Sequence, residues 1–159
     1  INYSKPHEVR RAPVAPGAVI GEVVRALECD LKDKAIRLTV TKEDLMVEAD
    51  EQLLRQALFN LLLNAIQAVD AGGEIHIVTD KSSATEAFLD VRDNGPGVPL
   101  AQRLEIFKPY FTTHQKGTGL GLAVVRQIVL AHGWDIQCLP NEPKGAIFRL
   151  SNLKLSTAI

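Results

Sequence analysis

Cysteine is scarce in this chain of 159 residues, where Cys29 and Cys138 lie far apart. They carry no metal-binding spacing, and we expect two reduced thiols in a cytosolic domain. No apolar run approaches the ~20 residues that a membrane-spanning helix needs, and no signal peptide is visible. The chain begins at Ile1 rather than at a methionine, so we expect it to be part of a longer protein.

An excess of charge of either sign is also missing. The chain has 18 basic and 19 acidic side chains, which gives a formal net charge of -1. This balance provides no field that would attract nucleic acid or an anionic membrane, so we expect no nucleic-acid partner. Hydrophobic residues make up 46% of the chain, which suits a single globular domain with a substantial core.

Hydrophobic periodicity predicts helices, strands and one long loop. The expected helices span residues 18–31, 50–69 and about 118–132, and the expected strands span 36–41, 45–49, 74–79, 87–93, 134–139 and 145–151. Asp50 is expected to cap the long helix, and the first two strands read as a hairpin-like pair. The order of elements lacks the strict alternation of a parallel sheet and predicts a mixed sheet with helices on one face.

Asn60 and Asn64 lie one turn apart in the long predicted helix, so their side chains project from one stripe. Asparagine is a poor helix former in mid-helix positions. Its amide oxygen can ligate a hard cation, and its amide nitrogen can donate to a phosphate. The alternative is a pair of polar side chains that are satisfied within the helix.

Asp93 ends the predicted strand 87–93 and shares one face with the strand's apolar side chains. We therefore expect Asp93 to point toward the core, where a carboxylate needs hydrogen-bond donors. Gly95 and Gly97 allow a sharp turn and the close approach of a flat ligand. The exocyclic amine of adenine would suit Asp93, whereas the carbonyl of guanine would not. The alternative is an Asx turn that simply ends the strand.

Three glycines at every second position, Gly117, Gly119 and Gly121, precede an apolar helical run. A helix start offers free N–H groups and a positive dipole end, which suit a phosphate. The pattern differs from the dinucleotide-binding G-x-G-x-x-G and lacks the G-K-S/T of a P-loop. A flexible hinge into the helix is the alternative. The segment 94–116 before it is expected to be a long irregular loop, which is usually functional or disordered.

Together and in this order, these motifs resemble the catalytic and ATP-binding domain of bacterial two-component sensor histidine kinases, within the GHKL superfamily. NLLLNAIQAV is similar to the N box, DNGPGVP to the first glycine box, IFKPYFTT to the F box, and GTGLGLAVVRQIVLAHG to the second glycine box. The resemblance covers residues 18–151. It implies a Bergerat-type two-layer α/β sandwich with a mixed sheet of about five strands and three helices. Residues 1–17 would end a dimerisation and phosphoacceptor hairpin with its linker, and residues 18–159 would form the ATP-binding domain.

The resemblance implies a role for individual residues. Asn64 would hold Mg²⁺ between the ATP phosphates, Asn60 would act beside it as the second catalytic residue, and Asp93 would read the adenine amine. The loop 99–116 matches an ATP lid, in which Phe107 would provide an apolar anchor together with Phe111. The expected nucleotide-binding residues are Asn60, Asn64, Gln67, Ala68, Asp93, Gly95, Gly97, Val98, Thr112, Thr113, Lys116, Gly117, Thr118, Gly119, Leu120, Gly121 and Leu122.

Asn60 also separates two mechanisms. ATPase members of the superfamily carry a glutamate one turn before the metal-holding asparagine, where it acts as a general base on water. An amide cannot accept that proton, so Asn60 favours a kinase over an ATPase. The expected function is transfer of the γ-phosphoryl group from Mg-ATP to a histidine by positioning and charge neutralisation. A GHKL-type ATPase and a non-catalytic adenine-nucleotide-binding module are the alternatives.

The acceptor histidine is expected to lie outside this chain. HEVRR at His7 is similar to a phosphoacceptor box, but its proline follows at six residues rather than five, and no room remains for a second hairpin helix. His76, His114 and His132 are expected at the surface. The implied partners are the protein's own dimerisation domain and a response-regulator receiver domain. We expect this chain to be monomeric and cytoplasmic, within a homodimeric protein.

Four positions depart from the family pattern. Lys108 stands where an acidic residue is common, and His114 takes a position that is often lysine. Trp134 stands where a second glycine is frequent, and Ala146 stands where a threonine often bonds the adenine through water. These departures affect the expected details of nucleotide affinity rather than the expected fold.

Overall fold

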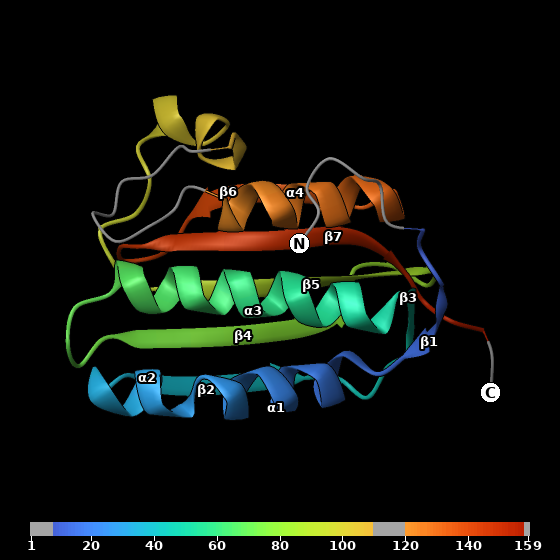
Figure 1. Cartoon of the computed structure of the whole chain (residues 1–159), viewed down its shortest axis with the longest axis horizontal. Coiled ribbons are helices and arrows are strands. Elements are labelled where there is room, and N and C mark those ends of the chain that lie inside the picture. Colours follow the sequence, from blue (N-terminus) through green and yellow to red (C-terminus); the bar gives the residue numbers. More distant parts are fainter. Residues whose placement is uncertain (1–7, 110–119, 158–159) are drawn as a thin grey trace.

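The structure, a computed structural model, describes residues 8–109 and 120–157. Figure 1 shows a sheet whose one face is covered by α1, α3 and α4. The strands are β1 (Ala12–Val14), β2 (Arg37–Lys42), β3 (Val47–Ala49), β4 (Glu74–Lys81), β5 (Glu86–Asp93), β6 (Asp135–Pro140) and β7 (Ala146–Lys154). The α-helices are α1 (Pro16–Ala26), α2 (Glu28–Asp33), α3 (Glu51–Ala68) and α4 (Gly121–His132), with 3₁₀ turns η1 (Leu100–Gln102) and η2 (Glu105–Phe107).

The main sheet has five strands in the order β2-β4-β5-β7-β6. Strands β2 and β4 run parallel, and the other neighbours run antiparallel, so the expected mixed sheet of about five strands is confirmed. The expected pairing of the first two predicted strands is wrong. Strand β2 joins β4, whereas β3 leaves the sheet and pairs with β1. The parallel pair needs a crossover connection, and β3 and α3 lie within that connection.

Strand β1 lies in the segment that the sequence assigned to the linker. Its three residues pair with β3, and Val14 at its end is buried. Proline is tolerated at Pro13 because a two-stranded ribbon has free edges that need no N–H donor. Residues 12–14 are therefore a structured part of the domain, and a run this short shows no periodicity in the sequence.

The first predicted helix, 18–31, is broken in two. Leu27 separates α1 from α2 with φ -107° and ψ 15°, outside the helical range. Leu27 and Leu31 are both buried, so the apolar stripe continues through the break. Periodicity alone therefore could not reveal it. Proline at Pro16 starts α1, where its missing N–H removes no helical hydrogen bond.

Helix α3 is the centre of the core. Asp50 caps it as expected, since Oδ1 accepts a hydrogen bond from the Leu53 N–H at 3.2 Å. Its leucines Leu54, Leu58 and Leu61 are at most 1% exposed and pack in one cluster with sheet residues such as Leu89. Burial of each such leucine contributes about 1.5–3 kcal/mol. This packing fixes the direction in which the polar stripe of α3 points.

A carboxylate is buried on the other face of the sheet. Asp90 is fully buried, although its neighbours Leu89 and Val91 face the helices. Arg149 lies directly opposite on β7 and donates two hydrogen bonds to Asp90, at 2.8 and 2.9 Å. Arg92 donates two more, at 3.1 and 2.8 Å. The two guanidinium groups shield Asp90 from water without a covering helix.

Candidate functional site

The polar stripe of α3 faces the start of α4. Asn60 and Asn64 are both half-buried, and the side-chain nitrogen of Asn60 donates to the Gly121 carbonyl at 3.4 Å. Gln67, one turn farther along, is exposed. Helices α3 and α4 lie side by side (Figure 1), and this hydrogen bond places the Asn60 amide beside the first turn of α4.

Asp93 ends β5 with its carboxylate buried, as the alternation along the strand predicted; it is 2% exposed. Its Oδ1 accepts the Gly95 N–H at 2.9 Å, which is the Asx turn offered as the simpler interpretation. The same oxygen also accepts the Ala146 N–H of β7 at 3.3 Å. The carboxylate is thus held from two segments of the chain, and the local turn is only part of its environment.

The two glycines of the loop after β5 sit against backbone. A Cβ added at Gly95 would lie 2.7 Å from the Ala68 carbonyl oxygen, at the end of α3. Gly97 has φ +81°, a conformation that favours glycine, and its Cβ would lie 3.0 Å from the Gly145 carbonyl oxygen. Val98 follows and packs partly against the core. These contacts hold the loop of Asp93 between α3 and the β6–β7 turn.

The segment from Pro99 to Pro109 is more regular than expected. It contains the two 3₁₀ turns η1 and η2, which are too short to produce a periodic pattern. Phe107 is buried and meets Phe148 edge to face, with ring centroids 6.1 Å apart. Phe107 is thus packed into the core, while its role as an anchor of the lid stays a prediction and Phe111 lies outside the described residues.

Several predicted site residues lie outside the described residues, namely Thr112, Thr113, Lys116, Gly117, Thr118 and Gly119. Helix α4 begins at Gly121 rather than near Thr118, with Leu120 as its N-cap. Leu120 and Leu122 are half-buried, and a Cβ added at Gly121 would meet nothing within 4 Å. The first-turn N–H groups and the positive dipole end of α4 therefore lie beside Asn60.

The prediction that His132 lies at the surface is wrong, because the ring is 3% exposed. The last turn of α4 packs against the beginning of α3, which the sequence could not show. The ring stacks on Trp134 with centroids 3.9 Å apart. Burial lowers the pKa of His132, because desolvation disfavours the charged form.

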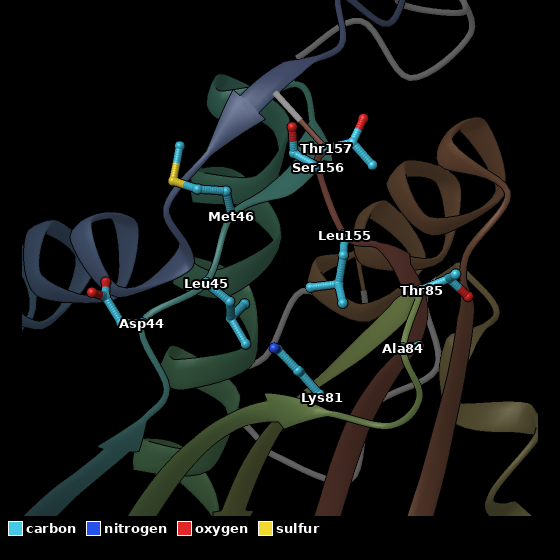
Figure 2. Close-up of a pocket in the computed structure, with 9 residues that line it drawn as sticks. All are labelled: Asp44, Leu45, Met46, Lys81, Ala84, Thr85, Leu155, Ser156 and Thr157. Carbon is cyan, nitrogen blue, oxygen red and sulfur yellow. The ribbon is translucent and has the colours of Figure 1, made fainter. Parts of the chain in front are cut away.

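A separate pocket of about 470 Å³ lies at the other end of β5. It is bordered by Thr85, just before that strand, and by the ends of β4 and β7. Figure 2 shows the Lys81 side chain extending into the space between Leu45 and Leu155. None of the predicted site residues lines this pocket. In the described parts of the chain, no helix is both long and apolar enough to cross a membrane.

Comparisons with known proteins agree with the resemblance. A family model described as "Histidine kinase-, DNA gyrase B-, and HSP90-like ATPase" matches residues 49–157. The chain is 39% identical over 148 residues to the sensor histidine kinase ZraS of Escherichia coli (strain K12), which covers 92% of this chain and 32% of that protein. The chain thus spans about a third of the length of this curated relative.

Solved structures show the same fold. The catalytic domain of histidine kinase ThkA superposes with a TM-score of 0.83 at 33% identity, covering 91% of this chain and 96% of that one. Full-length ShkA in complex with AMPPNP gives a TM-score of 0.86 at 26% identity, covering 98% of this chain and 33% of that one. With its family model, its relatives and its fold in agreement, the chain belongs to the histidine kinase-, DNA gyrase B- and HSP90-like ATPase family.

Proposed function

We propose that this chain is the ATP-binding catalytic domain of a sensor histidine protein kinase. One observation carries the proposal: the loop that holds the Asp93 carboxylate lies, at Gly95, against the end of α3, the helix that carries Asn60 and Asn64. The proposal assigns recognition of the base to Asp93 and contacts with the phosphates to Asn60 and Asn64. The similarity to ZraS, a sensor histidine kinase, supports the same assignment.

Asp93 is the proposed reader of the base. Its carboxylate can only accept hydrogen bonds when ionised, so it suits the exocyclic amine of adenine and repels the carbonyl of guanine. The N–H groups of Gly95 and Ala146 fix one of its oxygens in place. Gly97, Val98 and Ala68 are proposed to border the base, because they lie on the segments that enclose Asp93.

Asn60, Asn64 and the start of α4 are the proposed phosphate site, with Gln67 at its edge. The donor set fits Mg-ATP, because a single amide oxygen suits Mg²⁺ whose other ligands are phosphate oxygens and waters. When bound, Mg²⁺ would neutralise charge on the phosphates. The N–H groups at Gly121 and Leu122 would orient the phosphates through the helix dipole. We propose that Thr112, Thr113, Lys116 and residues 117–120 also contact the nucleotide, the last four through backbone N–H groups near the phosphates.

The chemistry is proposed to be phosphoryl transfer rather than hydrolysis. Asn60 cannot take a proton from water, so the chain lacks a general base at the position where an ATPase needs one. Neither described histidine suits the role of acceptor, since His132 is buried and His76 lies on a strand, hydrogen-bonded to Thr41. We therefore assign the acceptor to a histidine on a separate dimerisation domain, reached through residues 1–17.

The proposed partners follow from that assignment. The phosphoryl group would pass on to a response-regulator receiver domain, and a structure of ThkA with the response regulator protein TrrA provides a parallel. The protein would be a homodimer through its dimerisation domain, while residues 18–159 alone would be monomeric and cytoplasmic. No nucleic acid takes part.

Calorimetric titration tests the binding step. ATP, ADP and GTP are titrated with and without Mg²⁺ into the wild type, Asn64→Ala and the control Gln52→Ala, which lies exposed on the first turn of the same helix. We expect adenine nucleotides to bind and GTP to fail, with the Mg²⁺ dependence lost only in Asn64→Ala. Failure of every nucleotide to bind the wild type would contradict the proposal.

A second assay separates the alternatives. The chain is incubated with labelled ATP, with and without an added dimerisation domain that carries an acceptor histidine. We expect phosphohistidine on the added domain and negligible release of phosphate without it. Rapid hydrolysis without an acceptor would favour the ATPase, and binding without either reaction would favour a non-catalytic module.

A further inference from the structure

The turn between β6 and β7 rests directly on the end of β5. The side-chain nitrogen of Asn141 donates to the main-chain oxygen of Asp93 at 2.9 Å. At the start of β7, the N–H of Ala146 donates to the Asp93 carboxylate at 3.3 Å. The hairpin therefore holds both the main chain and the side chain of Asp93, although the partners are 48 and 53 residues apart in the sequence.

The orientation of the Asn141 amide is fixed by its two neighbours. Its Oδ1 accepts the Glu142 N–H at 2.9 Å, which leaves the NH₂ group directed at Asp93. The Asn141 N–H closes the turn on the Gly145 carbonyl at 3.0 Å. Asn141 is half-buried, so solvent competes only partly for these bonds. The side chain thus links the tip of the hairpin to the segment it supports.

Gly145 allows the two backbones to touch. A Cβ at this position would lie 1.9 Å from the Asp93 main-chain oxygen and 2.9 Å from the Asn94 Cα. Its φ of +111° is itself a conformation that side chains rarely adopt. The Gly145 carbonyl also approaches Gly97 on the far side of the Asp93 loop. No residue other than glycine fits at 145 without moving Asp93.

We propose that Asn141 and Gly145 are positioning residues for base recognition, which hold Asp93 where its carboxylate meets the amine of adenine. The inference rests on the proposed function and extends it, because every expected site residue lies between Asn60 and Leu122. A hydrogen bond weakens steeply when its angle and length depart from the optimum. A loosened Asp93 would therefore lose the amine contact first, while contacts to the phosphates would persist.

The discrimination between two nucleotides measures this effect. ATP carries the exocyclic amine, and purine riboside 5′-triphosphate is the same nucleotide without it. The affinity ratio of the two reports only the amine contact, since all other contacts are shared. A purely structural role for the turn would lower both affinities together and leave the ratio unchanged.

The experiment compares Asn141→Asp, which keeps the size and the acceptor but loses the donor, with the control Lys144→Ala, exposed in the same turn. Asp93→Ala, which removes the acceptor, marks the complete loss of discrimination. We expect Asn141→Asp to weaken ATP about three- to tenfold, the effect of one lost hydrogen bond, with the analogue little changed. If Gly145→Ala folds, it should reduce the ratio of ATP affinity to analogue affinity further. If it does not fold, the result for Asn141→Asp alone tests the inference.

Two other outcomes would overturn the inference in distinguishable ways. If the wild type prefers ATP over the analogue and Asn141→Asp keeps the full ratio, the turn has no positioning role, and the proposed function stands. If the wild type binds neither nucleotide, the proposed function fails, and this inference fails with it.

Discussion

The ring Nε2 of His132 accepts a hydrogen bond from the Asp50 N–H at 3.0 Å and so joins the end of α4 to the beginning of α3. Its Nδ1 donates to the Ile128 carbonyl at 2.8 Å, which defines a single neutral tautomer. Arg11 donates to the His132 carbonyl, and the Arg10 N–H donates to the Asp50 carboxylate. The segment before α1 is therefore fastened to both helices that carry the candidate site.

This junction predicts a loss of stability in mild acid. Burial lowers the pKa of His132 below its ordinary value of 6.5, and nearby Arg11 lowers it further, against the opposing effects of the Ile128 hydrogen bond and Asp50. At pH values above 6.5, the His132 ring is neutral in both the folded and the unfolded chain. As the pH falls through 6.5, the unfolded chain binds the proton first, so the free energy of unfolding falls until the folded pKa is reached.

Urea unfolding between about pH 8 and about pH 5 measures this slope. We expect His132→Gln to be less stable than the wild type at neutral pH and to have a flatter dependence below 6.5. The control Gln52→Ala, exposed on the first turn of α3, removes no titrating side chain and should keep the wild-type slope. Equal slopes in the wild type and His132→Gln would show that His132 does not titrate in this range.

The Asp90 cluster predicts a second effect on stability. The buried Asp90 carboxylate raises the pKa of Arg149 by hydrogen bonding, and the guanidinium also lies 5.2 Å from the Phe88 ring centroid. Arg149→Met keeps the aliphatic bulk but removes two of the four donors to Asp90. We expect a loss of about 1–2 kcal/mol, below that of a fully buried pair, because the Arg149 side chain is 32% exposed.

The exposed pair of Arg37 and Glu74 provides the control for Arg149→Met. Arg37→Met should change the free energy of unfolding by at most about 0.5 kcal/mol, since ion pairs in water contribute little. Chemical denaturation of both variants decides the matter. If the two substitutions had equal effects, the Asp90 cluster would add nothing beyond an ordinary surface pair.

Phe107→Ala is expected to affect both stability and binding. The change removes a buried ring and leaves a cavity against Phe148, with an expected loss of about 3–5 kcal/mol. ATP affinity should also fall, because the segment that leads into the proposed lid loses its anchor. Leu104→Ala, at a side chain that is 82% exposed, should stay within about 0.5 kcal/mol of the wild type. Calorimetric unfolding and ATP titration check both expectations, and similar results for the two variants would contradict them.

Local patterns predicted the features whose signals lie within a single element. The Asp50 cap, the apolar face of α3 and the alternation that turns Asp93 inward each depend on neighbours a few residues away, and the structure has all three. That Asn60 and Asn64 project from one stripe of α3 follows in the same way from helical periodicity. These residues provide the two halves of the candidate site.

Features that depend on distant partners were missed. No local pattern marks Asp90 as buried, because its burial depends on Arg149, 59 residues away. His132 read as an exposed helix end, yet its partner Asp50 lies 82 residues away. The contact of Asn141 with Asp93 belongs to the same class, because no motif in the sequence marks it. Strand partners are likewise set by packing, which explains the mistaken pairing of β2 with β3.

The parallel pairing of β2 with β4 has a consequence for the order of folding. Strands β4 and β5 are joined by a short turn, as are β6 and β7, so these hairpins can close early. Strand β2 can pair with β4 only after the long connection between them, which contains β3 and α3, has packed into place. We expect β2 to join last and to open first in the native protein, so that amide protons near Val40 exchange faster than those of β5.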